Sequence, residues 1–119
     1  MQNASRAYAK AALDIASPRQ LEAGALLTAA AKLQAVLEKW QGRSASLDEA
    51  LLFNRRLWIV FIDAVLRDDN KLSAAVRGNV LRLGMVVMNK TFAGMTAPRP
   101  DDLKTIIEIN RGLAAGLSS

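Results

Sequence analysis

Two asparagines beside arginines carry the most specific chemistry in this chain. Asn54 precedes Arg55 and Arg56 in the middle of the sequence, and Asn110 precedes Arg111 near the C-terminus. Each asparagine falls on the apolar stripe of an expected helix. A buried amide must find hydrogen-bond partners or carry a large desolvation cost. We therefore expect both sites to make specific polar contacts in a mostly apolar helical domain.

Each motif has two interpretations at this stage. Asn54 and Asn110 either fix the register of a helical bundle or contact a partner directly. Arg55 and Arg56 should point away from the core, where they are either solvated over packed stems or form a basic patch for an acidic partner. Arg111 lies in a last helical turn, where a cation also suits the exposed carbonyls.

Large apolar side chains supply further candidates for partner contact. Trp58 suits either the core or a binding hot spot. Met85 and Met88 either fill gaps in the core or line a groove for a helical ligand. Tyr8 and Ile15 belong to a short N-terminal helix, which either docks on the bundle through them or moves aside to expose a groove.

The composition disfavours catalysis and metal binding. The chain has no Cys and no His, so disulfides and thiolate metal sites are excluded, and the usual general base is missing. The carboxylate pairs Asp68–Asp69 and Asp101–Asp102 lack the ligand spacing of a calcium loop. We expect a non-enzymatic protein without a cofactor.

Length and the lack of a long apolar run predict a single cytoplasmic domain. The 119 residues, 51% of them hydrophobic, suffice for one domain spanning 1–119. The longest apolar run, Leu57 to Ile62, is far shorter than the ~20 residues that cross a bilayer. The net charge of +5 favours acidic partners, RNA included, although no block of five or more basic residues forms an RNA-binding arm.

Helix signals dominate and predict an all-α bundle of about five helices. Strand patterns are nearly absent. Ser46 and Ser73 are the expected N-caps of the third and fourth helices, Asn70 a left-handed C-cap residue, and Gly94 and Gly116 the stops of the last two. The expected ranges are Ser5 to Ala16, Pro18 to Gln41, Leu47 to Asp68, Ala74 to Ala93 and Pro100 to Gly116.

Apolar spacing also predicts which side of each helix is buried. The third helix is apolar almost all round and should be central, with its core stripe at Leu47, Leu51, Asn54, Trp58, Phe61 and Val65. The core positions expected in the fourth helix are Val76, Val80, Leu83, Val87 and Met88. Those of the last are Leu103, Ile106, Ile107, Asn110, Leu113 and Leu117.

Several segments together resemble the FlaF family of bacterial flagellar biosynthesis regulators. The most specific is Phe53-Asn54-Arg55-Arg56-Leu57-Trp58. The others are Ala7-Tyr8, Gln20-Leu21-Glu22-Ala23, Asn70-Lys71-Leu72, and Ile109-Asn110-Arg111 through Gly116-Leu117.

This resemblance implies a cytoplasmic flagellar accessory protein that acts as a flagellin chaperone and promotes flagellin synthesis and export. A helical bundle with a groove could mask the terminal amphipathic helices of flagellin. The implied partner is flagellin, with FlbT and the export apparatus as further candidates. The alternatives are a regulator acting on flagellin mRNA, alone or with FlbT, and an adaptor that never touches flagellin. The expected partner-binding residues are Tyr8, Asn54, Arg55, Arg56, Trp58, Met85, Met88, Asn110 and Arg111.

Overall fold

Residues 18–118 are described in a computed structural model of the chain, and they form four helices without any strand. The all-α class predicted from the sequence is confirmed over this range. The additional helix expected from Ser5 to Ala16 lies outside the described residues. The four helices are α2 (Pro18–Glu38), α3 (Ala45–Leu66), α4 (Ala74–Thr96) and α5 (Pro100–Ser118).

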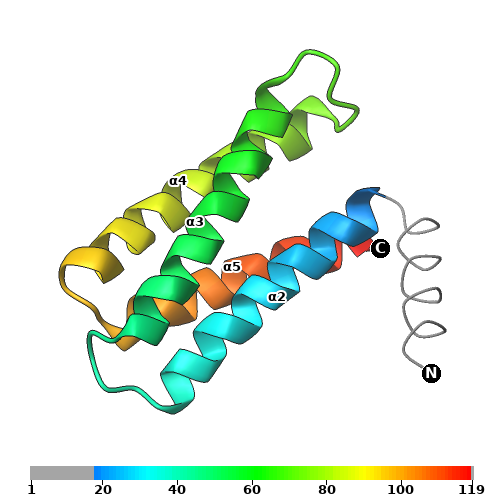
Figure 1. The fold of residues 1–119 in the computed structure, drawn as a ribbon. Helices are drawn as coiled ribbons and strands as arrows, with labels where there is room; N and C mark the ends of the chain where they lie inside the picture. The colour runs from blue at the N-terminus through cyan, green and yellow to red at the C-terminus, as the bar shows by residue number, and fades with distance from the viewer. Residues whose placement is uncertain (1–17, 119) are drawn as a thin grey trace, which may run out of the picture.

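The helices pack as two antiparallel pairs. Helix α2 lies along α5, and α3 lies along α4 (Figure 1). The pairs meet at the end that holds the α2–α3 loop and the α4–α5 turn, and they diverge toward the opposite end. At the closed end, the Arg43 guanidinium donates to the carbonyls of Met95 and Thr96, and Lys90 pairs with the buried Asp102 at 3.3 Å.

Local capping explains where α3 and α4 begin. The Ser73 hydroxyl accepts a hydrogen bond from Val76 N–H at 3.2 Å, which confirms the predicted cap. The prediction for α3 was wrong, because Ser44 rather than Ser46 is the N-cap and accepts from Leu47 N–H at 3.1 Å. Two serines spaced by one residue offer the same local signal, and the path of the preceding loop decides between them.

The predicted helix ends were less accurate. Helix α2 ends at Glu38, before Gln41, whereas α4 continues through Gly94 to Thr96 and α5 through Gly116 to Ser118. Asn70 is not left-handed, because no described residue other than glycine has a positive φ. Its side chain instead donates to the Ala64 carbonyl at 3.0 Å and accepts from Leu72 N–H at 2.9 Å.

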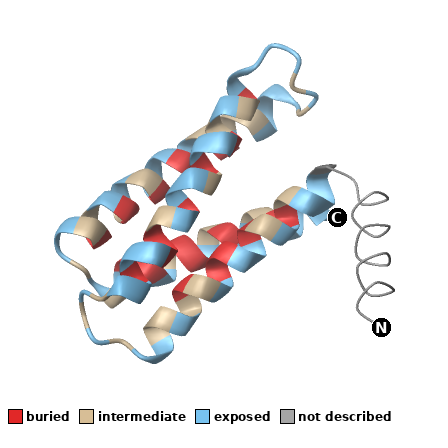
Figure 2. Cartoon of the chain, viewed as in Figure 1, coloured by how far each residue is buried: buried red, intermediate tan, exposed pale blue. Residues whose placement is uncertain are grey.

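The core lies where the four helices meet (Figure 2). All six predicted core positions of α3 are buried, as are Leu103, Ile106, Ile107 and Asn110 of α5. In α4, Val80 and Val87 are buried, Leu83 and Met88 are half-buried, and Val76 is exposed. Val76 lies in the first turn of α4, at the end where the helix pairs diverge, so no second pair covers it.

Two glycines allow α4 to lie close to α3. A Cβ at Gly84 would come within 3.0 Å of Ile62 Cδ1, and one at Gly94 within 3.2 Å of Leu51 Cδ1. Gly94, expected to stop the helix, is therefore a packing residue inside it. The absence of a side chain at these two positions sets the distance between α3 and α4.

We expect Gly84→Val to lower the free energy of unfolding by about 1–3 kcal/mol, because the added methyls overlap Ile62 in a packed seam. Gly78→Val is the matched control, since a Cβ there meets nothing closer than an Arg82 guanidinium nitrogen at 3.6 Å. Urea denaturation followed by circular dichroism measures both variants. Equal stabilities would show that the seam tolerates the extra volume.

Candidate functional site

A buried hydrogen-bonded cluster joins three helices at the centre of the bundle. The Asn110 Oδ1 of α5 accepts from Trp58 Nε1–H of α3 at 2.9 Å. The Asn110 amide nitrogen donates to Asn54 Oδ1 at 2.7 Å and to the Leu26 carbonyl of α2 at 3.5 Å. Two asparagines that are 56 residues apart in the sequence thus bond one another.

The cluster places three of the expected partner-binding residues inside the protein. Asn54, Trp58 and Asn110 each have 0% exposure. Their polar atoms face one another, so in this structure they hold the bundle together and present no surface to a partner. Their role here is to fix the register of α2, α3 and α5.

One donor of the cluster has no acceptor. The amide nitrogen of Asn54 is buried without a hydrogen-bond partner among the described residues. An unpaired buried donor typically costs about 1–3 kcal/mol. The cluster is therefore well satisfied at Asn110 and poorly satisfied at Asn54, so the two asparagines should differ in their contribution to stability.

A second feature is an apolar surface on the outside of the α3–α4 hairpin, which we call the outer face. This face consists of residues at helical spacing on α3 and α4. They lie on the side of the α3–α4 contact that points away from α2 and α5. The face comprises Leu52, Arg55, Ile59, Ile62 and Leu66 of α3, and Leu81, Met85, Met88, Phe92 and Met95 of α4.

The outer face exposes an unusual amount of large apolar side chain. Phe92 is 70% exposed, Met85 68%, Leu66 60% and Ile59 47%. Met88 is half-buried along the same stripe. Scattered apolar residues are normal on protein surfaces, but several large ones at helical spacing on two adjacent helices make this face a candidate interaction surface. The expected methionines thus lie on one surface, together with Phe92, which the sequence reasoning missed.

The signal for Phe92 was present in the sequence. Leu81, Met85, Met88, Phe92 and Met95 recur every three or four residues and form a second stripe on α4, beside its core stripe. A helix with two adjacent apolar stripes has more apolar surface than one packing partner covers. The pattern alone does not say which stripe faces the core.

The three expected arginines do not share one surface. Arg55 lies within the outer face, and Arg56 follows about 100° further round α3. Arg111 is exposed on α5, which packs on the inner side of the hairpin. The expectation that Arg111 lies in the last turn was wrong, because α5 continues to Ser118. Within residues 18–118, neither Arg55 nor Arg56 has an ion-pair partner. Tyr8 lies outside the described residues.

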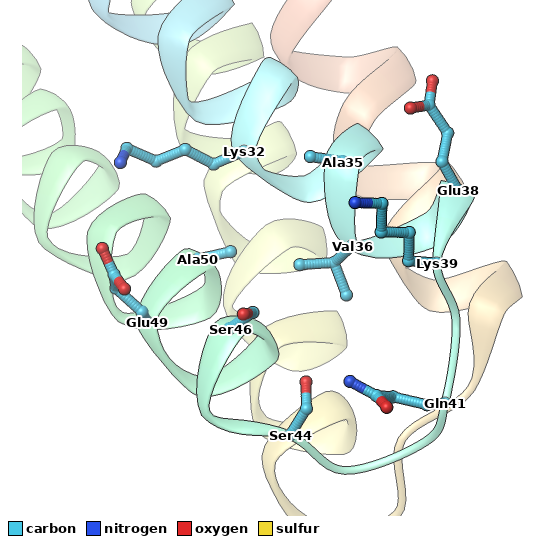
Figure 3. Close-up of a pocket in the computed structure, with 10 residues that line it drawn as sticks. All are labelled: Lys32, Ala35, Val36, Glu38, Lys39, Gln41, Ser44, Ser46, Glu49 and Ala50. Carbon is cyan, nitrogen blue, oxygen red and sulfur yellow. The ribbon is translucent and has the colours of Figure 1, made fainter.

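A pocket of about 520 Å³ lies between the end of α2 and the start of α3 (Figure 3). Val36 and Ala50 face each other across it, and the Glu38 carboxylate points away. Nearby, the Lys32 ammonium lies 5.1 Å from the centre of the Phe53 ring. Two lysines and two glutamates border the pocket, so its charge selects no ligand, and none of the expected site residues lines it. Its lining is Lys32, Ala35, Val36, Glu38, Lys39, Gln41, Ser44, Ser46, Glu49 and Ala50.

A smaller apolar depression lies between the diverging helix pairs. Its walls include Phe61, Val80, Leu113 and Leu117, and Glu22 of α2 borders it. Burial raises the pKa of the Glu22 carboxyl, while the positive charge of Arg19 opposes part of that shift. The Glu22 carboxyl thus borders an apolar surface, which disfavours its charged form.

Together these features define a small helical protein with a buried polar centre and an exposed apolar face. None of the helices within residues 18–118 is long and apolar enough to cross a membrane. No group of three or more His, Cys, Asp or Glu that could hold a metal ion occurs in that range.

The chain belongs to the FlaF family. A family model described as Flagellar protein FlaF matches residues 4–117, which is nearly the whole sequence. No curated protein and no solved structure matches the chain. Family membership gives the protein an accessory role in the bacterial flagellum, and it agrees with the resemblance carried by the two Asn-Arg motifs.

We expect Asn110→Ala to lower the free energy of unfolding by about 2–4 kcal/mol, because it leaves Trp58 Nε1–H and Asn54 Oδ1 unpaired and opens a cavity. Asn54→Ala should cost less, since its amide nitrogen is already unpaired. Urea denaturation is the measurement, with Asn89→Ala on the exposed surface of α4 as control. The reverse order of costs would contradict the hydrogen-bonding pattern.

We expect Glu22→Gln to stabilise the protein at neutral pH. Because the folded-state pKa of Glu22 is raised, the native protein binds this proton more tightly than the unfolded chain does. Stability is then lost as the pH rises above the ordinary value of 4.5. The advantage of Glu22→Gln should therefore disappear in acid. The urea midpoints of wild type and Glu22→Gln, measured across a range of pH, test this expectation. Glu108→Gln on α5 is the charge-matched control. A stability difference between Glu22→Gln and wild type that does not change with pH would refute the expectation.

Proposed function

We propose that the protein is a non-enzymatic, cytoplasmic chaperone that binds flagellin and promotes its synthesis and export. The observation that carries this proposal is the outer face, where Met85, Phe92 and Ile59 leave large apolar side chains exposed. Within the FlaF family, flagellin is the partner that the resemblance implies, and its terminal segments are expected to be amphipathic helices.

The chemistry of the outer face suits such a partner. Methionines are flexible and polarisable, so a surface with Met85, Met88 and Met95 adapts to varied apolar side chains. Phe92 supplies a rigid aromatic anchor of the kind that dominates binding energies. A flagellin helix bound along this face would bury its own apolar stripe. It could then not associate prematurely with other flagellin molecules.

A rigid interior supports the same role. The cluster of Asn54, Trp58 and Asn110 fixes the bundle, so the outer face is already formed before a ligand arrives. Preorganisation lowers the entropy lost on binding. In this account the polar centre contributes indirectly, and the exposed residues of α3 and α4 make the contacts.

The alternative is that the protein regulates flagellin translation by binding the flagellin message, alone or with FlbT. The net charge of +5 favours it. The exposed cations are scattered, however, and the aromatic side chain exposed on the outer face lies among methionines rather than among basic residues. We therefore favour the chaperone.

We expect monomeric flagellin from the same organism to bind saturably in isothermal titration, with a negative heat-capacity change from apolar burial. Met85→Ser combined with Phe92→Ser should weaken binding by about 10- to 100-fold, because it removes two anchors from the face. Leu27→Ser combined with Val60→Ser is the matched control, since both residues are exposed and apolar but lie off the outer face.

Circular dichroism must first show that both double variants remain folded. No binding of flagellin by the folded wild-type protein would overturn the chaperone proposal. Binding of the flagellin message leader, with an affinity that falls steeply as salt rises, would then support the regulator.

A further inference from the structure

We infer that the ligand of the outer face is an amphipathic helix whose apolar stripe is flanked by carboxylates, and that Arg55 selects it. This inference rests on the proposed binding at the outer face and names the chemistry of the bound segment. It begins from the position of Arg55, which follows Leu52 by three residues and precedes Ile59 by four, and so lies within the apolar stripe of α3.

The Arg55 guanidinium is not engaged elsewhere. Within residues 18–118 it has neither an ion-pair partner nor a side-chain hydrogen bond, and the residue is exposed. The carboxylates nearest to it along this side of α3 are Asp48, about two turns before it, and Asp63, about two turns after it. Asp48 pairs with Arg43 at 3.7 Å and Asp63 with Arg67 at 3.0 Å. The charge of Arg55 is therefore available to a ligand.

The cations of α4 are committed to contacts within the protein. Arg77 donates to the carbonyls of Val65 and Arg67 at 2.7 and 3.1 Å, and so satisfies the C-terminal end of α3. Lys90 pairs with the buried Asp102 on the inner side. The Arg82 guanidinium donates to Asn79.

Helix α4 also contains no acidic residue, so it adds no negative charge to the face. The outer face is thus apolar with a net positive charge, and Arg55 is its uncommitted cation.

The energetics of docking turn this charge into selectivity. A helix packed over Ile59, Met85 and Phe92 must remove water from the Arg55 guanidinium as well. A desolvated charge without a partner is strongly unfavourable. A carboxylate beside the ligand's apolar stripe would restore the lost interactions through a charge-assisted, bidentate hydrogen bond. A lysine in that place would be repelled, so the same residue rejects basic helices.

Arg56 has a different geometry. It lies about 100° round the helix from Arg55, outside the apolar stripe, and stays in water when a ligand docks. Exposed charges of this kind steer association and are screened by salt, but they add little to the affinity of the bound state. The two neighbouring arginines therefore form a matched pair, of which Arg55 alone should set the preference.

The test uses two synthetic helical peptides of about 20 residues that share one Leu/Ile stripe, with Glu flanking the stripe in one peptide and Lys in the other. Titration calorimetry with the whole 119-residue chain should show at least a tenfold preference for the Glu peptide. Arg55→Glu should reverse the preference, whereas Arg56→Glu and Arg111→Glu should preserve it.

The outcomes separate this inference from the proposed function. Equal binding of the two peptides, or an unchanged preference in Arg55→Glu, would overturn the inference while flagellin binding stands. Binding of flagellin but of neither peptide would also overturn it. A preference that reverses in Arg55→Glu without any flagellin binding would support the inference and remove the chaperone proposal. Binding of neither peptide nor flagellin would end both.

Discussion

The hydrogen bonds of the Asn110 side chain are the constraint on which the rest of the bundle depends. One amide accepts from Trp58 of α3 and donates to Asn54 of α3 and to the Leu26 carbonyl of α2. A core of Leu and Ile alone could slide by a turn with little loss, whereas these directional bonds form in one register. Helix α5 thereby fixes both α2 and α3. The position of α4 then follows from its pairing with α3, which comes close to it at Gly84 and Gly94.

The fixed arrangement also leaves part of the apolar surface uncovered. Helix α3 is apolar almost all round, but α2, α4 and α5 together cover less than its circumference. Helix α4 presents one stripe to α3 and α5 and a second, with Met85 and Phe92, to solvent. A protein of the FlaF family thus combines a rigid interior with an adaptable exterior. This division is the basis of the helix-binding role proposed above.

Sequence reasoning succeeded where the physical cause is local. The all-α class, the Ser73 cap and the complete core stripe of α3 follow from helical periodicity and from side chains within one turn. The family was also readable from short motifs around Asn54 and Asn110. The predictions that failed were the cap at Ser46, the left-handed Asn70 and the helix stop at Gly94, and each depends on the path of a loop or on a neighbouring helix.

The sequence by itself therefore determined the all-α class, the inner face of α3 and the need of two asparagines for partners, because these depend on spacing along one segment. Only the tertiary structure decided that the two asparagines bond each other across 56 residues, and that one of the two stripes of α4 stays exposed. It also decided that Arg55 lies within an apolar surface while Arg111 does not. These properties depend on which helices become neighbours. The apolar periodicity of a helix marks the face that can be buried, but it does not identify the helix that covers that face.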